Sequence, residues 1–303
     1  MKILVTGGAG FIGSHVVDLL IENEQEVFVI DNLSSGRLEN LNPKARFFKQ
    51  DLCDYETIEK IIGENRPEIV YHLAAQIDVR KSVENPVFDT QNNVLATINL
   101  LELCKKYKIK HFIFSSTGGA IYGDAKEIPT AENYAEKPIC PYGCAKLSIE
   151  KYLHYYNFVH GLKYTALRYG NVYGPRQNPH GEAGVVAIFI NNMLNGKNPV
   201  IFGGRQTRDF VFVEDVAKAN LLALNDNKSD IYNVGTGVET DIDNLFLKLN
   251  KLFDNKFQAA HMEMKKGEQL KSCISFNKIR ENLGWMPSWN IEDGLKKTYL
   301  SFK

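Results

Sequence analysis

The residues with the clearest chemical use are a tyrosine and a lysine four positions apart, Tyr142 and Lys146. Side chains with this spacing lie on the same side of a helix, one turn from each other. A free tyrosine is a poor base at neutral pH because its pKa is about 10. A nearby ammonium group, or the positive nicotinamide of an oxidised dinucleotide, favours the phenolate, so Tyr142 could take a proton from a substrate hydroxyl. The alternative is a chance pair on the surface of a helix.

A row of hydroxyl side chains precedes this pair in the sequence. Residues 112–114 read Phe-Ile-Phe, which is typical of a buried strand, and Ser115, Ser116 and Thr117 follow directly. In an open parallel sheet, ligands bind at the carboxyl ends of the strands. Ser116 or Thr117 could therefore hydrogen-bond the reacting oxygen beside Tyr142. The alternative is that these hydroxyl groups only cap the end of the strand.

Three glycines near the N-terminus, Gly7, Gly10 and Gly13, separate an apolar run from a segment of helical periodicity. Glycine lets the backbone turn tightly and approach a pyrophosphate, whose charge the N-terminus of a helix favours. The next apolar run ends at Asp31, whose carboxylate could accept hydrogen bonds from an adenosine ribose. Because this carboxylate would repel a 2′-phosphate, the cofactor is predicted to be NAD and not NADP. A purely structural turn is the alternative.

The elements that must position these groups alternate between strands and helices. Apolar runs near residues 2–6, 27–30, 47–48, 69–71 and 112–114 alternate with helical periodicity over 11–23, 55–63 and 86–107. This alternation predicts the α/β class, with a doubly wound parallel Rossmann sheet and a smaller C-terminal substrate-binding α/β region. We expect residues 1–172 to form the NAD-binding domain, to which the chain returns around 210–237. Residues 173–209 and 238–303, where prolines and glycines interrupt the pattern, are expected to bind the substrate.

The composition is that of an ordinary globular protein. The 303 residues include 36 basic and 36 acidic side chains, so no nucleic-acid partner is expected. The five scattered cysteines indicate a reducing compartment, and without a signal peptide or an apolar membrane span the protein is expected in the cytoplasm. Cys140 and Cys144 lack the spacing of thiol oxidoreductases. His72 has no partner at metal-ligand spacing, so no metal site is predicted.

Four segments together resemble the extended short-chain dehydrogenases/reductases, the NAD-dependent epimerases and dehydratases, and within them most closely the UDP-glucose 4-epimerases. The segments are Gly-Gly-Ala-Gly-Phe-Ile-Gly at 7–13, His-Leu-Ala-Ala at 72–75, Tyr-Gly-Cys-Ala-Lys at 142–146 and Arg-Tyr-Gly-Asn-Val-Tyr-Gly-Pro at 168–175. The resemblance runs from Met1 to about Trp285. Four motifs in the same order are more specific than any one of them.

The resemblance implies a role for each matching residue. Tyr142 would be the acid/base, Lys146 would hold the nicotinamide ribose, and Ser116 or Thr117 would assist. The implied cofactor contacts are Gly7, Gly10, Phe11, Ile12, Gly13, Asp31, Asn32, Ser35, Gly36, Asp51, Leu52, Leu73, Ala74, Ala75, Lys81, Asn93, Ser115, Tyr142, Lys146 and Tyr169. The implied substrate contacts are Lys81, Thr117, Tyr142, Asn171, Arg176, Arg208, Lys265 and Glu268.

The implied reaction moves a hydride from C4 of a UDP-hexose to NAD and returns it to the other face of a 4-keto sugar. The cofactor is regenerated in each cycle and should stay bound. The resemblance also implies a homodimer through the helices over 86–107 and 141–160, where Tyr152, Tyr155, Tyr156 and Phe158 suit either an interface or the core.

Several departures from the epimerase pattern bear on the chemistry. The stretch 115–122 is one residue longer than usual, which leaves the choice between Ser116 and Thr117 open. Gly118-Gly119 replaces the Asp-Glu of the dehydratases, which counts against dehydration. Lys265 replaces an arginine near the pyrophosphate and loses its bidentate fork. Ser272 falls where some epimerases have a bulky tyrosine, which predicts acceptance of 2-acetamido sugars.

The sequence is also compatible with two other functions. One is a UDP-glucuronate epimerase or decarboxylase on the same scaffold, which would need a cation facing the sugar carboxylate. The other is a non-catalytic nucleotide-binding protein. A purely binding protein would not require Tyr142, Lys146 and Thr117 together.

Overall fold

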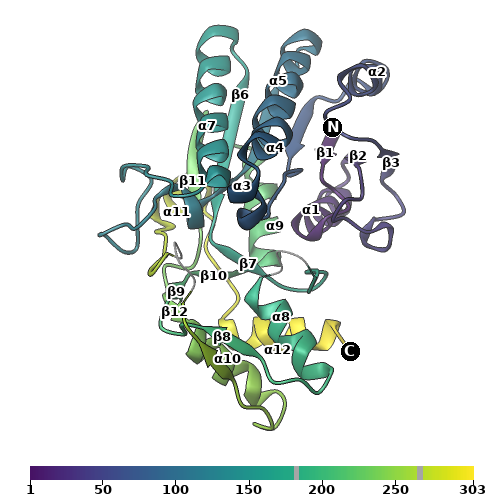
Figure 1. Cartoon of the computed structure of the whole chain (residues 1–303). Coiled ribbons are helices and arrows are strands. Elements are labelled where there is room, and N and C mark those ends of the chain that lie inside the picture. Colours follow the sequence, from purple (N-terminus) through teal and green to yellow (C-terminus); the bar gives the residue numbers. More distant parts are fainter. Residues whose placement is uncertain (181–183, 265–268) are drawn as a thin grey trace.

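A seven-stranded parallel sheet forms the centre of the computed structural model, which describes residues 1–180, 184–264 and 269–303 (Figure 1). The strand order is β11-β6-β5-β4-β1-β2-β3. The order reverses between β1 and β4, and ligands bind at such a reversal in open sheets. The predicted doubly wound fold is confirmed. The strands are β1 (Lys2–Thr6), β2 (Glu26–Asp31), β3 (Arg46–Lys49), β4 (Ile69–His72), β5 (His111–Thr117), β6 (Lys163–Tyr169) and β11 (Asp230–Val234).

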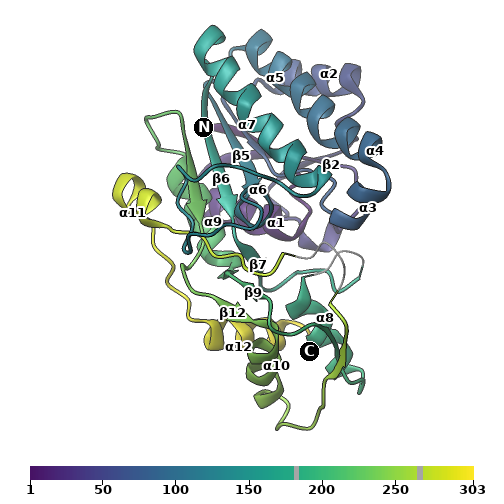
Figure 2. The same cartoon turned by 60° about the vertical axis from the view of Figure 1, so that its left-hand side comes forward.

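Helices cover both faces of this sheet, as the two views show (Figures 1 and 2). Helices α1 (Phe11–Glu22) and α9 (Val213–Ala223) pack on one face, and α2 (Tyr55–Asn65), α5 (Ala96–Tyr107) and α7 (Pro141–His160) pack on the other. Successive strand side chains point to opposite faces, so Val5 belongs to the first core and Leu4 to the second. A strand buried on both faces must be apolar throughout, which explains the continuous apolar runs in the sequence.

The helix predicted over 86–107 has an irregular middle. It consists of α4 (Pro86–Thr90), one π-helical turn (Gln91–Leu95) and α5, and it follows the short helix α3 (Val79–Glu84). Single π-helical turns occur often at functional sites. Here the turn contains Asn93, one of the predicted cofactor contacts.

The rest of the chain forms a smaller part below the sheet in Figure 1. Its apolar core contains side chains of α8, α10 and α12. β11 returns the chain to the large sheet as predicted, whereas β10 pairs with β7 in a separate two-stranded sheet. The remaining elements of the whole chain, some of which lie beside the large sheet, are α6 (Gly118–Ile121), β7 (Asn171–Tyr173), α8 (Val185–Leu194), β8 (Val200–Phe202), β9 (Thr207–Arg208), β10 (Phe210–Phe212), β12 (Thr240–Asp241), α10 (Ile242–Lys251), β13 (Ala260–Met262), α11 (Asn277–Leu283) and α12 (Ile291–Ser301), with a 3-10 turn at Leu38–Asn40.

A helix that crosses a bilayer needs about 20 consecutive, mostly apolar residues. Within residues 1–180, 184–264 and 269–303, no helix combines sufficient length with sufficient apolar character to cross a bilayer.

Candidate active site

The glycine-rich turn between β1 and α1 leaves no room for a side chain at Gly7 or Gly13. Gly7 has a φ of +72°, and a Cβ atom there would lie 2.6 Å from the Ala74 amide nitrogen. A Cβ atom on Gly13 would lie 2.1 Å from the Gly7 carbonyl oxygen. Helix α1 starts after Gly10 without a side-chain cap, so the helix itself does not satisfy the N–H groups of its first turn, which include Phe11 and Ile12. This cradle fits the pyrophosphate of a dinucleotide.

Asp31 stands at the end of β2, next to the glycine-rich turn. It is 8% exposed, and its carboxylate accepts hydrogen bonds from the backbone N–H of Ala9 at 3.0 Å and of Leu33 at 2.8 Å. Burial raises the pKa of this carboxyl group. Gly36 lies so close that a Cβ atom on it would be 3.0 Å from Asp31 Oδ1. A carboxylate has about four acceptor positions, so Asp31 can also accept bonds from a ribose.

Four other predicted cofactor contacts, Asn32, Ser35, Asp51 and Leu52, lie in the loops after β2 and β3. Asn32 Nδ2 donates to Asp51 Oδ2 at 2.9 Å, which joins the loops that follow β2 and β3. The hydrogen bond from the Cys53 N–H holds the pKa of Asp51 below its usual value. Ser35 and Leu52 belong to the same two loops.

Asn93 supports the loop after β4 that contains Leu73, Ala74 and Ala75. Its side chain accepts from Gln76 N at 2.8 Å and donates to Gln76 O and to Asp89 Oδ1, both at 3.0 Å. Asn93 is 2% exposed, so its side chain supports this loop from the interior and is not open to a ligand at the surface.

Asp89 was missed by the sequence analysis. It is fully buried and shares its Oδ1 atom between Gln76 and Asn93. Its Oδ2 atom is buried without a hydrogen-bond partner in the described part of the chain. The available signal was its position four residues before Asn93, on the same face of the helix.

Lys146 lies in the interior and not on a helix surface. It is 2% exposed, its ammonium donates to the Ser115 carbonyl oxygen at 2.7 Å, and its Nζ atom lies 4.7 Å from the centroid of the Phe114 ring. Nζ is also 5.7 Å from the centroid of the Tyr142 ring. Burial lowers the pKa of Lys146 to about 7, although Asp89 and Glu150 oppose this shift. The alternative of a surface pair is therefore wrong.

Tyr142 is half-buried at the start of α7, and its backbone N–H donates to Ser82 Oγ at 3.3 Å. Burial raises the pKa of its phenol well above the ordinary value, and the nearby acidic groups of Cys140 and Asp89 act in the same direction. The protein's own groups thus do not produce the lowered pKa that the Tyr142–Lys146 spacing predicts.

The hydroxyl groups at the end of β5 point in different directions. Ser116 is 3% exposed and donates to Glu150 Oε1 at 2.6 Å. Strand alternation places Ser115 and Thr117 on the opposite face of β5 from Ser116. Thr117 is half-buried. The structure therefore gives Ser116 a partner within the core and leaves Thr117 at the strand end.

Asn171, in β7, offers an unused acceptor close to this strand end. Its backbone N–H donates to the Asp209 carbonyl at 2.7 Å, but its side-chain Oδ1 is buried without a partner in the described residues. A Cβ atom on Gly119 would lie 3.6 Å from this oxygen. A buried acceptor of this kind suits a hydrogen-bond donor of a ligand.

Tyr169 points into the interior, where its hydroxyl is 3.0 Å from Asn220 Oδ1. Lys81 is exposed, with Nζ 4.8 Å from the centroid of the Phe88 ring. Arg208 Nη1 donates to the carbonyl oxygens of Thr207 and Gln269 at 2.8 and 2.9 Å.

Within the described residues, no hydrogen bond or ion pair joins Arg176 to the other predicted substrate contacts. Its guanidinium forms an ion pair with Asp18 of α1 at 2.7 Å. A substrate contact would have to compete with that pair. Lys265 and Glu268, the other two predicted contacts, lie outside the described residues.

His72 is a structural residue. Its ring nitrogens lie 2.7 Å from Thr6 Oγ1 and 2.8 Å from Thr97 Oγ1, and burial lowers its pKa to about 3. A neutral imidazole between two threonines explains this histidine without a ligand.

A glycine-lined turn after β1, together with a buried lysine one helical turn from a tyrosine at the carboxyl end of β5, defines a dinucleotide-dependent enzyme of the short-chain dehydrogenase/reductase type. The chain belongs to the NAD dependent epimerase/dehydratase family, whose sequence model matches residues 3–235. The predicted family and cofactor are thereby confirmed.

Solved structures of high similarity cover the whole chain. A UDP-glucose 4-epimerase with UDP-glucose from Thermotoga maritima is 51% identical, with a TM-score of 0.98 over 100% of this chain and 98% of its own. A UDP-glucose 4-epimerase from Thermus thermophilus, in complex with NAD, is 41% identical, with a TM-score of 0.95 over 100% and 99% of the two chains. A UDP-N-acetylglucosamine 4-epimerase from Methanobrevibacter ruminantium is 38% identical, with a TM-score of 0.94 over 99% and 97%.

Proposed function

We propose that the protein is an NAD-dependent epimerase that inverts C4 of UDP-glucose and UDP-galactose. The observation that carries this proposal is the Tyr142–Lys146 pair, in which the buried Lys146 ammonium donates to Ser115 at the carboxyl end of β5 and lies 5.7 Å from the centroid of the Tyr142 ring. The names of the similar structures from Thermotoga maritima and Thermus thermophilus support the choice of sugar nucleotide.

The chain's own residues have distinct tasks in this reaction. When bound, NAD supplies an acceptor for the hydride from C4 and later its donor. Tyr142 takes the proton of the C4 hydroxyl as the hydride leaves, and gives a proton back when the 4-keto sugar is reduced on its other face. Proton and hydride both return, so the net change is an inverted carbon.

Tyr142 needs positive charge nearby to act as a base. Burial raises its pKa, and Lys146 is the protein cation beside it. We infer that Lys146 and the oxidised nicotinamide together stabilise the phenolate. Thr117 is the strand-end hydroxyl that would hydrogen-bond the C4 oxygen, because Ser116 donates to Glu150.

The smaller part of the molecule would hold the sugar nucleotide. We assign residues 1–172 and 210–237 to the NAD-binding part, and 173–209 and 238–303 to the substrate-binding part. The Asn171 Oδ1 atom, which has no hydrogen-bond partner among the described residues, suits a sugar hydroxyl, and Arg208 suits the diphosphate because its planar fork matches two phosphate oxygens. Arg208 also ties β9 to Gln269, at the edge of the segment that contains Lys265 and Glu268.

The same site has a feature that favours 2-acetamido sugars as additional substrates. Ser272 is 6% exposed, and its backbone N–H donates to the Thr207 carbonyl at 3.2 Å, one residue from Arg208. A small side chain here leaves volume that a tyrosine would fill. A similar structure is named as a UDP-N-acetylglucosamine 4-epimerase. Ser272→Tyr should abolish turnover of UDP-N-acetylglucosamine and spare UDP-galactose; equal loss of both would contradict this assignment.

The proposed assembly is a homodimer through α5 and α7. On α7, Tyr155 is 47% exposed, Phe158 84% and Val159 52%, whereas Tyr156 belongs to the core. Three exposed apolar side chains on one helix suit an interface. Phe158→Arg should shift the protein to monomers in size-exclusion chromatography with light scattering. We also expect a cytoplasmic location, where the five free cysteines would stay reduced.

The deciding experiment is to incubate the NAD-loaded protein with UDP-galactose, without an added redox partner, and to separate the products by chromatography. Appearance of UDP-glucose, and its absence with Tyr142→Phe, would support C4 epimerisation. No conversion by protein with bound NAD would contradict it, and UDP-glucuronate would then be the next substrate to test.

A further inference from the structure

Helix α7 carries a third polar residue, which is buried, on the face of Tyr142 and Lys146. Glu150 follows Lys146 by four positions, so the three side chains form one stripe along the helix. Glu150 is 1% exposed. The carbonyl of Ser115 receives the Lys146 ammonium, and the hydroxyl of the next residue, Ser116, donates to Glu150 at 2.6 Å. Two successive residues of β5 thus hold two successive turns of α7.

Arg168 of β6 completes this connection from the neighbouring strand. Ser116 and Arg168 are direct partners in the parallel register of β5 and β6, so they lie side by side below α7. Arg168 Nε donates to Glu150 Oε1 at 3.0 Å, and Nη2 donates to Oε2 at 2.6 Å. This bidentate geometry fixes the orientation of both side chains as well as their separation.

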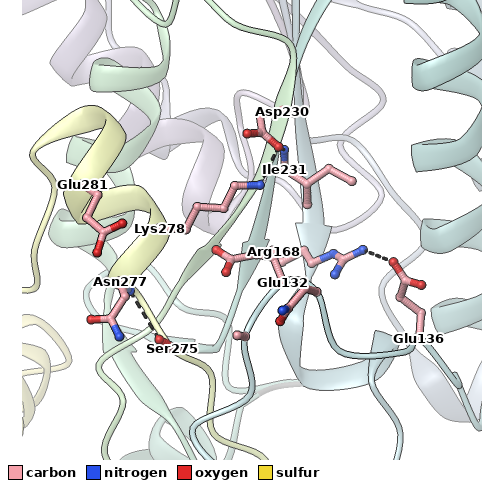
Figure 3. Close-up of a pocket in the computed structure, with 11 residues that line it drawn as sticks. Glu132, Glu136, Arg168, Asp230, Ile231, Ser275, Asn277, Lys278 and Glu281 are labelled. Atoms are coloured by element: carbon pink, nitrogen blue, oxygen red, sulfur yellow. Dashed lines mark hydrogen bonds and ion pairs between the residues drawn. The ribbon is translucent and has the colours of Figure 1, made fainter.

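The guanidinium is itself held from three sides. Its Nη1 donates to the Tyr122 hydroxyl at 2.8 Å, and that hydroxyl donates to Asn233 Oδ1 of β11 at 2.8 Å. Its Nη2 also donates to Glu136 Oε1 at 2.9 Å. Figure 3 shows Arg168 reaching Glu136 at the side of an open pocket. Arg168 has no exposed surface, so these partners replace water around its charge.

We propose that Glu150 and Arg168 are a positioning pair for the reaction, because they set the height of α7 on β5 and thereby the place of Tyr142 relative to the Thr117 hydroxyl. This inference rests on the proposed function only for its turnover assay. Neither residue is expected to touch the substrate, because the Glu150 carboxylate already accepts hydrogen bonds from Ser116 and Arg168 in the interior. The pair acts through the helix that also carries Tyr142 and Lys146.

The test uses NAD-loaded protein with Glu150→Asp, Arg168→Lys and the double variant. Each single change keeps the charge but shortens the reach or removes the fork. We expect kcat with UDP-galactose to fall about tenfold or more, because small displacements of a reacting group are costly. KM should change less than about twofold, and the double variant should match the single ones because all three break the same pair.

The matched control is Asp215→Asn in α9, on the opposite face of the sheet from α7, where another buried carboxylate accepts from Ser288 and Trp289. It should lower thermal stability and leave kcat unchanged at temperatures well below unfolding. An unchanged kcat in Glu150→Asp, a fall that Asp215→Asn reproduces, or additive effects in the double variant would overturn the positioning pair.

A second measurement does not depend on the sugar. The phenolate absorbance of Tyr142 in the NAD-loaded protein is titrated by difference from Tyr142→Phe. Glu150→Asp should displace α7 and thereby raise the pKa of the Tyr142 phenol, although the substitution removes no charge. If the wild type fails to convert UDP-galactose, the proposed function falls while this titration still decides the pair: a shifted pKa supports it, and an unchanged pKa refutes it.

Discussion

The part of the molecule that carries the proposed reacting groups is built differently from the part expected to hold the sugar nucleotide. Tyr142 and Lys146 lie on a 20-residue helix packed against a seven-stranded sheet, and buried side chains connect that helix to two strands. Arg208 lies on a two-residue strand, β9, whose partner β12 also has two residues. Groups that take part in proton and hydride transfer need fixed positions. Groups that bind a diphosphate act through charge attraction, which tolerates a wider range of distances and angles.

This contrast predicts that changes on the sheet side reduce the rate constant or cofactor binding, and that changes in the smaller part reduce substrate affinity. The largest expected effect is that of Tyr142→Phe, which removes the proton-transfer group. We expect kcat to fall by about 10³-fold, with NAD still bound. Tyr152→Phe is the control, because Tyr152 lies on the same helix and is 40% exposed. Turnover of Tyr142→Phe within about twofold of wild type would rule out the mechanism.

Gly13→Ala should abolish the cofactor cradle itself. The new Cβ atom would lie 2.1 Å from the Gly7 carbonyl oxygen, so the turn would have to open. We expect NAD affinity to fall by about 100-fold or more, measured by calorimetric titration of NAD-free protein. Gly63→Ala is the matched helix control, since its Cβ atom would meet only the end of the Tyr107 side chain, at 3.0 Å. Equal NAD affinity in Gly13→Ala and wild type would contradict the assignment.

The buried Lys146 should make stability depend on pH. The unfolded chain keeps this proton up to about pH 10.5, whereas the folded protein releases it at about pH 7. Between these values the unfolded state binds more protons, so the free energy of unfolding rises with pH. Relative to Lys146→Met, wild-type protein freed of NAD should gain up to about 2 kcal/mol between about pH 7 and pH 9. Urea unfolding at the two pH values measures this, and parallel pH profiles would show that the pKa is not lowered.

The smallest expected effect lies in the substrate-binding part. Arg208→Lys keeps the charge and loses the fork, so KM for UDP-galactose should rise about tenfold while kcat changes little. Arg205→Lys, on an exposed neighbour, should leave both constants unchanged. A fall in kcat without a change in KM in Arg208→Lys would contradict the prediction that changes in the smaller part act on substrate affinity and not on the rate constant.

Local patterns in the sequence were sufficient for much of the fold and of the site. Continuous apolar runs predicted the strands β1 to β5, and the run at 231–234 was rightly expected to return to the sheet. The spacing of Tyr142 and Lys146, and of the glycines at 7, 10 and 13, fixes their relation within a single turn or helix. Such relations depend on backbone geometry alone.

Only the tertiary structure decided which side chains from distant segments of the chain contact each other. Whether Ser116 or Thr117 faces the site depends on the register of β5 against β6, which pairs Ser116 with Arg168. The same tertiary packing places Asn93 in hydrogen-bond contact with Gln76 and Arg176 in an ion pair with Asp18. Hydrogen bonds of this kind join residues far apart in the chain, and a buried polar group takes whichever partner the packing brings to it. Residue type and spacing determined the chemistry available to this protein, and the packing of α7 on β5 and β6 decided which groups are placed to perform it.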